Sequence, residues 1–276
     1  MPELFGFDCY SPREIAERVE NVGVIKANLP LLPMTALGVL AGGFIGLGAL
    51  YFTIVASDSA LSFAPGRILG GLAFSLGLIL VVVAGAELFT GNNLLIMAWV
   101  SRRISASKLI TNLAIVLASN FLGAAGLAWL VSLSGHMDMN DGSVGKAAIS
   151  IATAKCAIPF AEAFFKGVLC NVLVCLAVWL ALAGRTVTDK ILAIIFPVSA
   201  FVAAGFEHSV ANMYFIPLAL FVSGPEAAAG LSWGGFFHNL LPVTLGNLVG
   251  GAGLVGLVYW VIYRRGLNIP PPGTAP

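Results

Sequence analysis

An interruption in a long apolar run decides the fold of this chain: Gly205-Phe206-Glu207-His208-Ser209-Val210-Ala211-Asn212. The run covers about residues 191 to 221, and a second run at about residues 68 to 100 is similarly too long for one membrane helix. A continuous helix of about 33 residues would extend roughly 50 Å, whereas the hydrocarbon core of a bilayer measures about 30 Å. The polar residues in the middle predict a broken helix rather than a strongly tilted one. Non-helical backbone at membrane depth is tolerated only against protein or a water-filled cavity, so the two breaks are predicted to line one path.

The composition excludes a soluble protein and a nucleic-acid-binding protein. Of the 276 residues, 59% are hydrophobic and 10% are charged, whereas about a quarter of residues are charged in soluble domains. The formal net charge of +1 provides no basic excess for a nucleic-acid groove, so DNA and RNA are excluded as partners. The four cysteines lack the paired spacing of a metal site or a disulfide framework, and they are interpreted as packing residues. The chain is therefore interpreted as an all-α integral membrane protein.

Neutral stretches between the charged residues predict six transmembrane helices, each compared with the roughly 20 residues that cross the core. They lie at about residues 31–57, 68–100, 109–134, 158–184, 191–221 and 239–263. The chain accordingly divides into an amphipathic N-terminal segment (1–30), a six-helix pore domain (31–264) and a proline-rich tail (265–276). A capping-box sequence at Ser11-Pro12-Arg13-Glu14 predicts a helix that lies along the membrane surface or against the bundle. No signal peptide is predicted before the first span.

Lysine and arginine are distributed unevenly between the two sides of the predicted membrane domain. The side of the N-terminus carries Arg13, Arg18, Lys26, Arg102, Arg103, Lys108, Arg185, Lys190, Arg264 and Arg265. The opposite side carries Arg67, Lys146 and Lys155. The positive-inside rule therefore places both termini in the cytoplasm, and lipid is the expected partner of the apolar helix faces.

The two halves of the chain resemble each other at three places in the same order. Lys26–Pro30 recurs as Lys155–Pro159 at an offset of 129, and Gly85-x-Glu87 with Asn92 recurs as Gly205-x-Glu207 with Asn212 at an offset of 120. Asn120–Leu127 recurs as Asn247–Leu254 at an offset of 127. Because each repeat holds three spans, the second half enters the membrane from the opposite side, which gives a 3+3 inverted repeat. This symmetry favours transport, and it places Lys26 and Lys155 at opposite mouths, which suits an anion.

Few ionisable residues lie within the predicted spans, namely Glu87, Glu162, Lys166, Glu207 and His208. Such residues are costly in a membrane and are functional candidates by default. His208 is the strongest candidate because an imidazole with an ordinary pKa of about 6.5 exchanges a proton near neutrality. Three alternatives remain open. In the first, His208 is a neutral ring that only forms a hydrogen bond with a backbone carbonyl. In the others, Glu87 and Glu207 accept hydrogen bonds from backbone donors at the breaks, and Glu162 pairs with Lys166.

Catalysis and cofactor binding are less well supported than transport. A b-type haem would need a second axial ligand at depth, but His136 and His238 fall at span ends or in loops. A serine hydrolase is disfavoured by the lack of a G-x-S-x-G sequence. No cofactor and no metal are therefore expected, and a membrane-embedded enzyme or redox subunit is the alternative. The patterns Gly42-x-x-x-Gly46 and Gly246-x-x-x-Gly250 favour close helix contacts, within the subunit rather than between subunits.

Four longer motifs resemble those of the formate/nitrite transporter family. They are Ala84–Asn92, Phe165–Trp179, Gly205–Met213 and Leu241–Asn247, and the resemblance extends from about Pro12 to Tyr263. It implies an aquaporin-like six-helix protomer, a homopentamer in the bacterial cytoplasmic membrane, and one small-anion pore in each protomer. The Phe201–Glu207 tract and the Phe74/Leu78 pair are closer to formate channels, whereas Glu87–Gly91 and Phe164–Gly167 are closer to nitrite channels. Formate is therefore the expected substrate, with nitrite or hydrosulfide as the alternative.

The resemblance also assigns roles to individual residues. His208 matches the family's central histidine, and Thr90 belongs to the loop that faces it. Phe74, Leu78 and Phe201 resemble the apolar constrictions, Asn171 and Asn247 resemble polar lining residues, and Lys155 resembles the lysine of the vestibule. Together with Glu207 and Lys26, these residues form the expected pore. A bare anion cannot cross a ring of Phe and Leu without losing hydration, so His208 is expected to supply or share a proton there.

Overall fold

The computed structural model describes residues 9–223 and 230–265, and within these ranges it contains helices and no strands. The first half contains α1 (Pro12–Ala27), α2 (Leu31–Ala56), α3 (Phe63–Ile79), η1 (Leu80–Gly85), α4 (Phe89–Asn92), η2 (Asn93–Leu95), α5 (Ile96–Val100) and α6 (Ala106–Leu133). After η3 (His136–Asp138) and α7 (Ser143–Cys156), the second half contains α8 (Phe160–Ala183), α9 (Val187–Ala204), α10 (Ser209–Val222), α11 (Trp233–Leu248), η5 (Val249–Leu257) and α12 (Val258–Tyr263).

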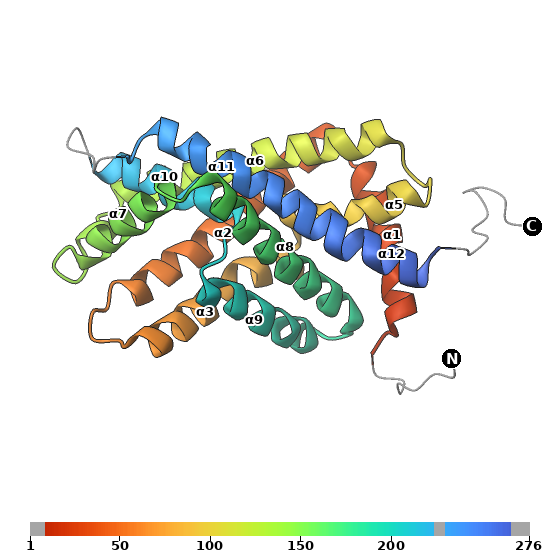
Figure 1. Ribbon diagram of the computed structural model, residues 1–276, viewed down its shortest axis with the longest axis horizontal. Coiled ribbons are helices and arrows are strands. Elements are labelled where there is room, and N and C mark those ends of the chain that lie inside the picture. Colours follow the sequence, from red (N-terminus) through yellow and green to blue (C-terminus); the bar gives the residue numbers. More distant parts are fainter. Residues whose placement is uncertain (1–8, 224–229, 266–276) are drawn as a thin grey trace, which may run out of the picture.

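Within residues 9–223 and 230–265, six helical runs are long and apolar enough to cross a membrane. They correspond to the six predicted spans, with the second beginning earlier, at Phe63, and the last beginning earlier, at Trp233. Figure 1 shows α11 and α12 as one long rod across the bundle, with α3 and α9 side by side below it. Between the third and fourth spans, where the sequence predicts no membrane span, the chain forms the additional helix α7.

The two predicted breaks are present. The second span stops at Gly85 and resumes at Phe89, and the fifth stops at Ala204 and resumes at Ser209. Each helical segment ends at a glycine with positive φ, +88° at Gly85 and +74° at Gly205, a backbone conformation that other L-residues adopt rarely. The inverted repeat is therefore visible in the backbone, because repeat-related glycines end the helix at repeat-related positions.

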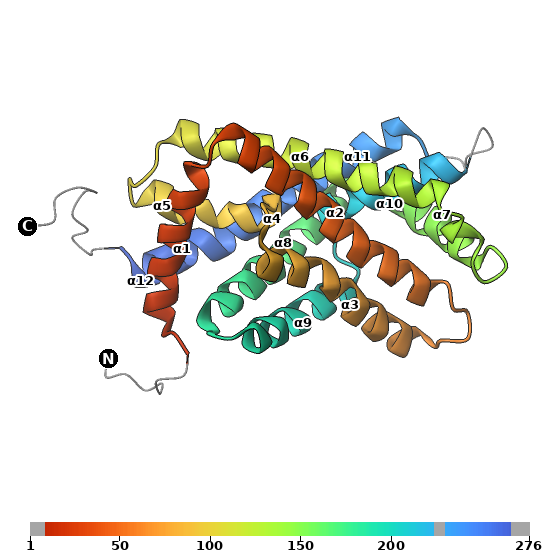
Figure 2. The same cartoon turned by 180° about the vertical axis from the view of Figure 1, so that it is seen from behind.

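The helix α1 begins with the predicted capping box. The Glu14 carboxylate accepts a hydrogen bond from the Ser11 backbone N–H at 2.7 Å, and the Ser11 hydroxyl accepts one from the Glu14 N–H. The Ser11 backbone N–H and the Ser11 hydroxyl both donate to the Glu14 carboxylate, and because these two bonds favour the charged form they lower the pKa of the Glu14 carboxyl. The buried side chains of Ile15 and Val19 pack against α5 and α8, so α1 lies against the bundle, and Figure 2 shows it crossing the ends of α5 and α12.

Close packing of the spans depends on glycine in two repeat-related pairs of helices, α2 with α6 and α8 with α11. A Cβ at Gly42 of α2 would overlap the backbone of Asn120 in α6, and a Cβ at Gly246 of α11 would overlap the backbone of Phe164 in α8. The helices approach each other closely because no side chain separates them. Both small-residue patterns therefore serve contacts within the subunit, as the sequence analysis favoured.

Candidate functional site

A network of polar side chains surrounds the break in the first half. Lys26 at the end of α1 places its Nζ 3.0 Å from Glu87 Oε1 and donates to Asn92 Oδ1 at 2.9 Å. The Asn92 amide donates to Glu87 Oε2 at 2.7 Å and to Asn112 Oδ1 at 2.9 Å, and Asn112 donates back to the Lys26 carbonyl. The carboxylate of Glu87 is therefore fully engaged by side chains and neutralises the charge of Lys26.

The second half builds a closely similar network from the repeat-related residues, although the Lys26–Asn92 bond has no counterpart there. Lys155 Nζ lies 2.7 Å from Glu207 Oε1. Asn212 donates to Glu207 Oε2 and to Asn239 Oδ1, each at 2.7 Å, and Asn239 donates to the Lys155 carbonyl at 2.9 Å. The symmetry extends from the backbone to individual hydrogen bonds. Each lysine predicted to attract anions is thus paired with a buried glutamate. The negative charge of the glutamate cancels most of the lysine's electrostatic field at the mouth of the pore.

The backbone donors exposed by the breaks bond to two other asparagines. Asn120 Oδ1 accepts from the Phe89 N–H at 2.9 Å, and Asn247 Oδ1 accepts from the Ser209 N–H at 3.0 Å. Their amides donate to the carbonyls of Glu87 and Glu207, respectively. The alternative that the two glutamate side chains accept these backbone bonds is therefore wrong. The asparagines fulfil that role because a neutral amide can donate and accept at once.

His208 begins α10 and is held on both ring nitrogens. Its Nδ1 accepts a hydrogen bond from the Ala211 N–H at 3.1 Å, as an N-cap side chain does. Since Nδ1 is an acceptor, the proton of the neutral ring resides on Nε2, which lies 3.0 Å from Thr90 Oγ1 and donates to it. The two residues come from the two different breaks and are both buried. The predicted pairing of His208 with the Thr90 loop is thus present as a direct contact.

Two cavities approach this contact from opposite directions. The first, of about 460 Å³, is lined by Lys26, Glu87, Leu78 and Leu88 among others. The second, of about 380 Å³, is lined by Lys155, Glu207, Phe74, Phe201 and His208 among others. Many of the lining positions are related by the repeat, as the pairs of lysines and glutamates illustrate.

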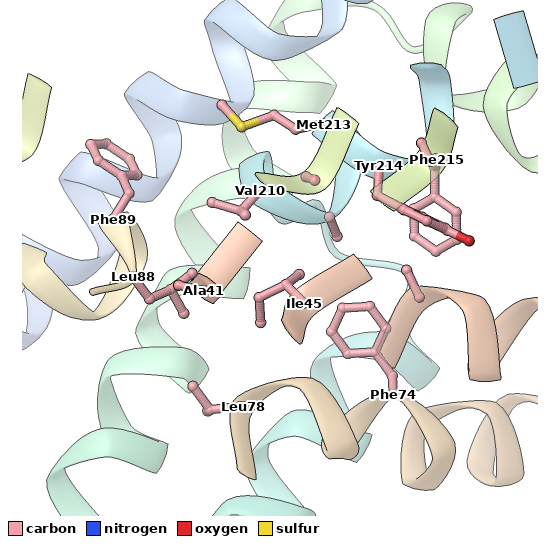
Figure 3. Close-up of a cluster of buried hydrophobic side chains, with 14 of the residues drawn as sticks. Ala41, Ile45, Phe74, Leu78, Leu88, Phe89, Val210, Met213, Tyr214 and Phe215 are labelled. Carbon is pink, nitrogen blue, oxygen red and sulfur yellow. The ribbon is translucent and has the colours of Figure 1, made fainter. Parts of the chain in front are cut away.

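Apolar side chains lie beside His208 and contribute to the linings of both cavities. Phe74 and Phe201 meet edge to face with ring centroids 5.7 Å apart, and Phe201 lies parallel to the His208 ring at 6.0 Å. Figure 3 shows Leu78 and Phe74 in the same buried cluster as Leu88. The structure thus brings together Phe74, Leu78 and Phe201, which only the family resemblance had singled out.

Asn171 and Asn247, which resemble polar lining residues, are fully buried and line neither cavity. Asn171 donates to the carbonyls of Asn247 at 2.6 Å and Thr90 at 3.3 Å. Both side chains therefore fix the backbone around the contact in this state of the protein.

Sequence reasoning missed Asn112 and Asn239, although their shared offset of 127 could have revealed them. Glu162 and Lys166 form the expected pair at 2.6 Å on the surface of α8.

Comparisons with known proteins agree with this geometry. The model of the family described as "Formate/nitrite transporter" matches residues 13–261. The chain is 40% identical to "Formate channel FocA" of Escherichia coli (strain K12) over 274 residues, 94% of this chain and 96% of that one. It is 41% identical to "Uncharacterized transporter YrhG" of Bacillus subtilis (strain 168) over 258 residues, 92% and 94% of the two chains.

Two solved structures are also similar. One is described as "Pentameric formate channel with formate bound"; it matches with a TM-score of 0.79 and 38% identity, over 84% of this chain and 97% of that chain. The other, an "FNT family ion channel", matches with a TM-score of 0.80 and 33% identity, over 91% and 98% of the two chains. The fold and the interrupted spans are therefore those of known channel structures.

Proposed function

Because the chain belongs to the formate/nitrite transporter family, a family of multi-pass membrane channels and transporters, we propose that it is a channel for formate. The observation that carries this proposal is the buried His208–Thr90 contact beside the packed rings of Phe74 and Phe201, with a lysine-lined cavity in each half of the protein. The similarity to formate channels supports formate over the alternative, nitrite, which the same family also transports by its description.

The geometry supports a mechanism in which His208 shares its proton with the anion. A bare carboxylate that enters an apolar ring loses hydration that nothing replaces. The Nε2–H of His208 can be redirected from Thr90 to an anion held between Phe74 and Phe201. This hydrogen bond offsets part of the lost hydration. For the anion to leave as the neutral acid, the ring first takes up a proton from solution at Nδ1 and gives up the bond from the Ala211 N–H; it then passes the Nε2 proton to the anion and returns to the neutral form.

Flux measurements test the proposal directly. Proteoliposomes that contain only this protein are loaded and assayed for formate, nitrite and hydrosulfide flux across pH. We expect formate flux that is strongly reduced in His208→Ala and His208→Phe. No formate flux in the wild-type protein would refute the proposal, and nitrite flux well above formate flux would support the alternative substrate. Substrate turnover or a bound chromophore without flux would instead support an enzyme or redox subunit.

We also propose the assembly and the orientation. The likeness to a pentameric channel supports a homopentamer, and the two cavities within a single subunit support one pore in each protomer. The ten lysines and arginines on the N-terminal side support cytoplasmic termini in the inner membrane of a bacterium. The predicted tail at residues 265–276 lies almost entirely outside the described residues. Mass determination of the detergent complex tests the first proposal, and reporter fusions at both termini test the second.

A further inference from the structure

The cations that line the two cavities differ in whether a carboxylate neutralises them. Lys26, Lys155 and Lys166 each have a glutamate oxygen within 3.0 Å. Arg67, which lines the second cavity, forms no such pair: no described carboxylate lies within 4.0 Å of its guanidinium. The repeat partner of Arg67, at an offset of 120, is Val187, so the first cavity has no equivalent charge.

Arg67 is held firmly at the wall of the second cavity. From α3 it donates through Nε to the Ala203 carbonyl and through Nη2 to the Val202 carbonyl, both at 2.9 Å. These are among the last carbonyls of α9, whose helix terminus carries only about half a negative charge. The guanidinium therefore retains a net positive charge, and within the described part of the chain its Nη1 has no hydrogen-bond partner.

We propose that Arg67 forms an anion-collecting subsite in the second cavity and makes the two mouths of the pore unequal. Guanidinium suits this role because it cannot lose its proton at physiological pH, so its charge is always present. The ligand is a small monovalent anion, the transported one included. This inference rests on the proposed channel function. It adds that anion flux reaches half of its maximum at a lower anion concentration when the anion enters from the Arg67 side. The first cavity, with its Lys26–Glu87 pair, lacks this advantage.

The experiment measures formate flux in right-side-out and inside-out membrane vesicles, at low and high concentrations of potassium gluconate. In the wild-type protein we expect a lower half-saturating concentration from one face, and this difference should vanish in high salt because salt screens the charge. Arg67→Gln should raise the half-saturating concentration about three- to fivefold, from that face only and in low salt. Arg67→Lys keeps the charge but not the two-carbonyl geometry, and it should stay close to wild type.

A control variant separates the charge at the cavity wall from a charge elsewhere on the protein. Lys146→Gln removes an exposed lysine of α7 that does not line the cavity, and it should leave both half-saturating concentrations unchanged. The inference is overturned if wild-type half-saturation is equal from the two faces in low salt. It is also overturned if Arg67→Gln affects both faces equally or if Arg67→Lys is as impaired as Arg67→Gln, since either result would indicate a purely structural role at the end of α9. Wild-type protein without any formate flux would refute the channel proposal itself.

Discussion

Replacing Glu207 by Gln removes the charge that faces Lys155 while it keeps the size of the side chain. In the native protein, Glu207 Oε1 accepts from Lys155 Nζ at 2.7 Å, and Oε2 accepts from Asn212 at 2.7 Å and from Asn239 at 3.4 Å. A glutamine must turn its NH₂ group toward one of these donors. Whichever way it turns, a donor faces a donor and Lys155 keeps an unpaired charge.

The expected size of the effect follows from burial. The side chain of Glu207 is 5% exposed and that of Lys155 is 15% exposed, and removal of one partner of a buried pair destabilises proteins by about 3–5 kcal/mol. The Lys166–Glu162 pair has nearly the same N–O distance, 2.6 Å, but its side chains are 32% and 52% exposed. Pairs of that kind on one helix contribute only about 0.3–0.5 kcal/mol. The two pairs therefore form a matched comparison in which burial is the main variable.

The assay is thermal unfolding of the purified protein in detergent, with Glu207→Gln and Glu162→Gln beside the wild type. We expect a large drop in the unfolding midpoint for the first variant and almost none for the second. The double variant Lys155→Met/Glu207→Gln should recover part of the loss, because it leaves no unpaired charge. Equal shifts in the two single variants, or no recovery in the double variant, would show that the buried pair does not contribute as argued.

Two further variants test the central residue and the helix packing. His208→Asn keeps an acceptor for the Ala211 N–H but cannot gain a proton, so formate flux in proteoliposomes should lose its dependence on pH; an unchanged pH profile would exclude proton sharing by the imidazole. Gly246→Ala should destabilise the protein by about 1–3 kcal/mol because its Cβ would overlap the Phe164 carbonyl. Gly253→Ala, where a Cβ meets no atom within 4 Å, is the control in thermal unfolding, and equal midpoints for the two variants would contradict the packing argument.

The spans, the breaks and the repeat could be predicted because each depends on local features of the sequence. The length of six apolar runs predicts membrane helices, and the excess length of two of these runs predicts the breaks. The repeat then follows from matched residues such as Glu87 and Glu207. The family match confirms the expected family, and the structure confirms six spans with interruptions in the second and fifth.

The features that could not be predicted depend on contacts between distant parts of the chain. The helix α7 follows a polar loop and is not long enough to count as a span, so hydropathy gave it no signal. The partners of Lys26 and Lys155 lie 61 and 52 residues away, and only the folded chain shows that both lysines are neutralised. Arg67 lies just before the second predicted span, and only the folded chain shows that its guanidinium lies beside α9.

Residues that stabilise the breaks differ from residues that act on the anion in whether both halves of the chain carry them. A break in a membrane helix exposes the same backbone groups wherever it occurs, so the residues that satisfy them are needed in both halves, as Asn120 and Asn247 are. A residue that acts on an anion at one central point is needed only once. His208 has Leu88 as its repeat partner at the offset of 120, and Arg67 has a valine. The positions that line the path but depart from the repeat are therefore the ones expected to set selectivity and direction, and substitutions there should alter flux more than stability.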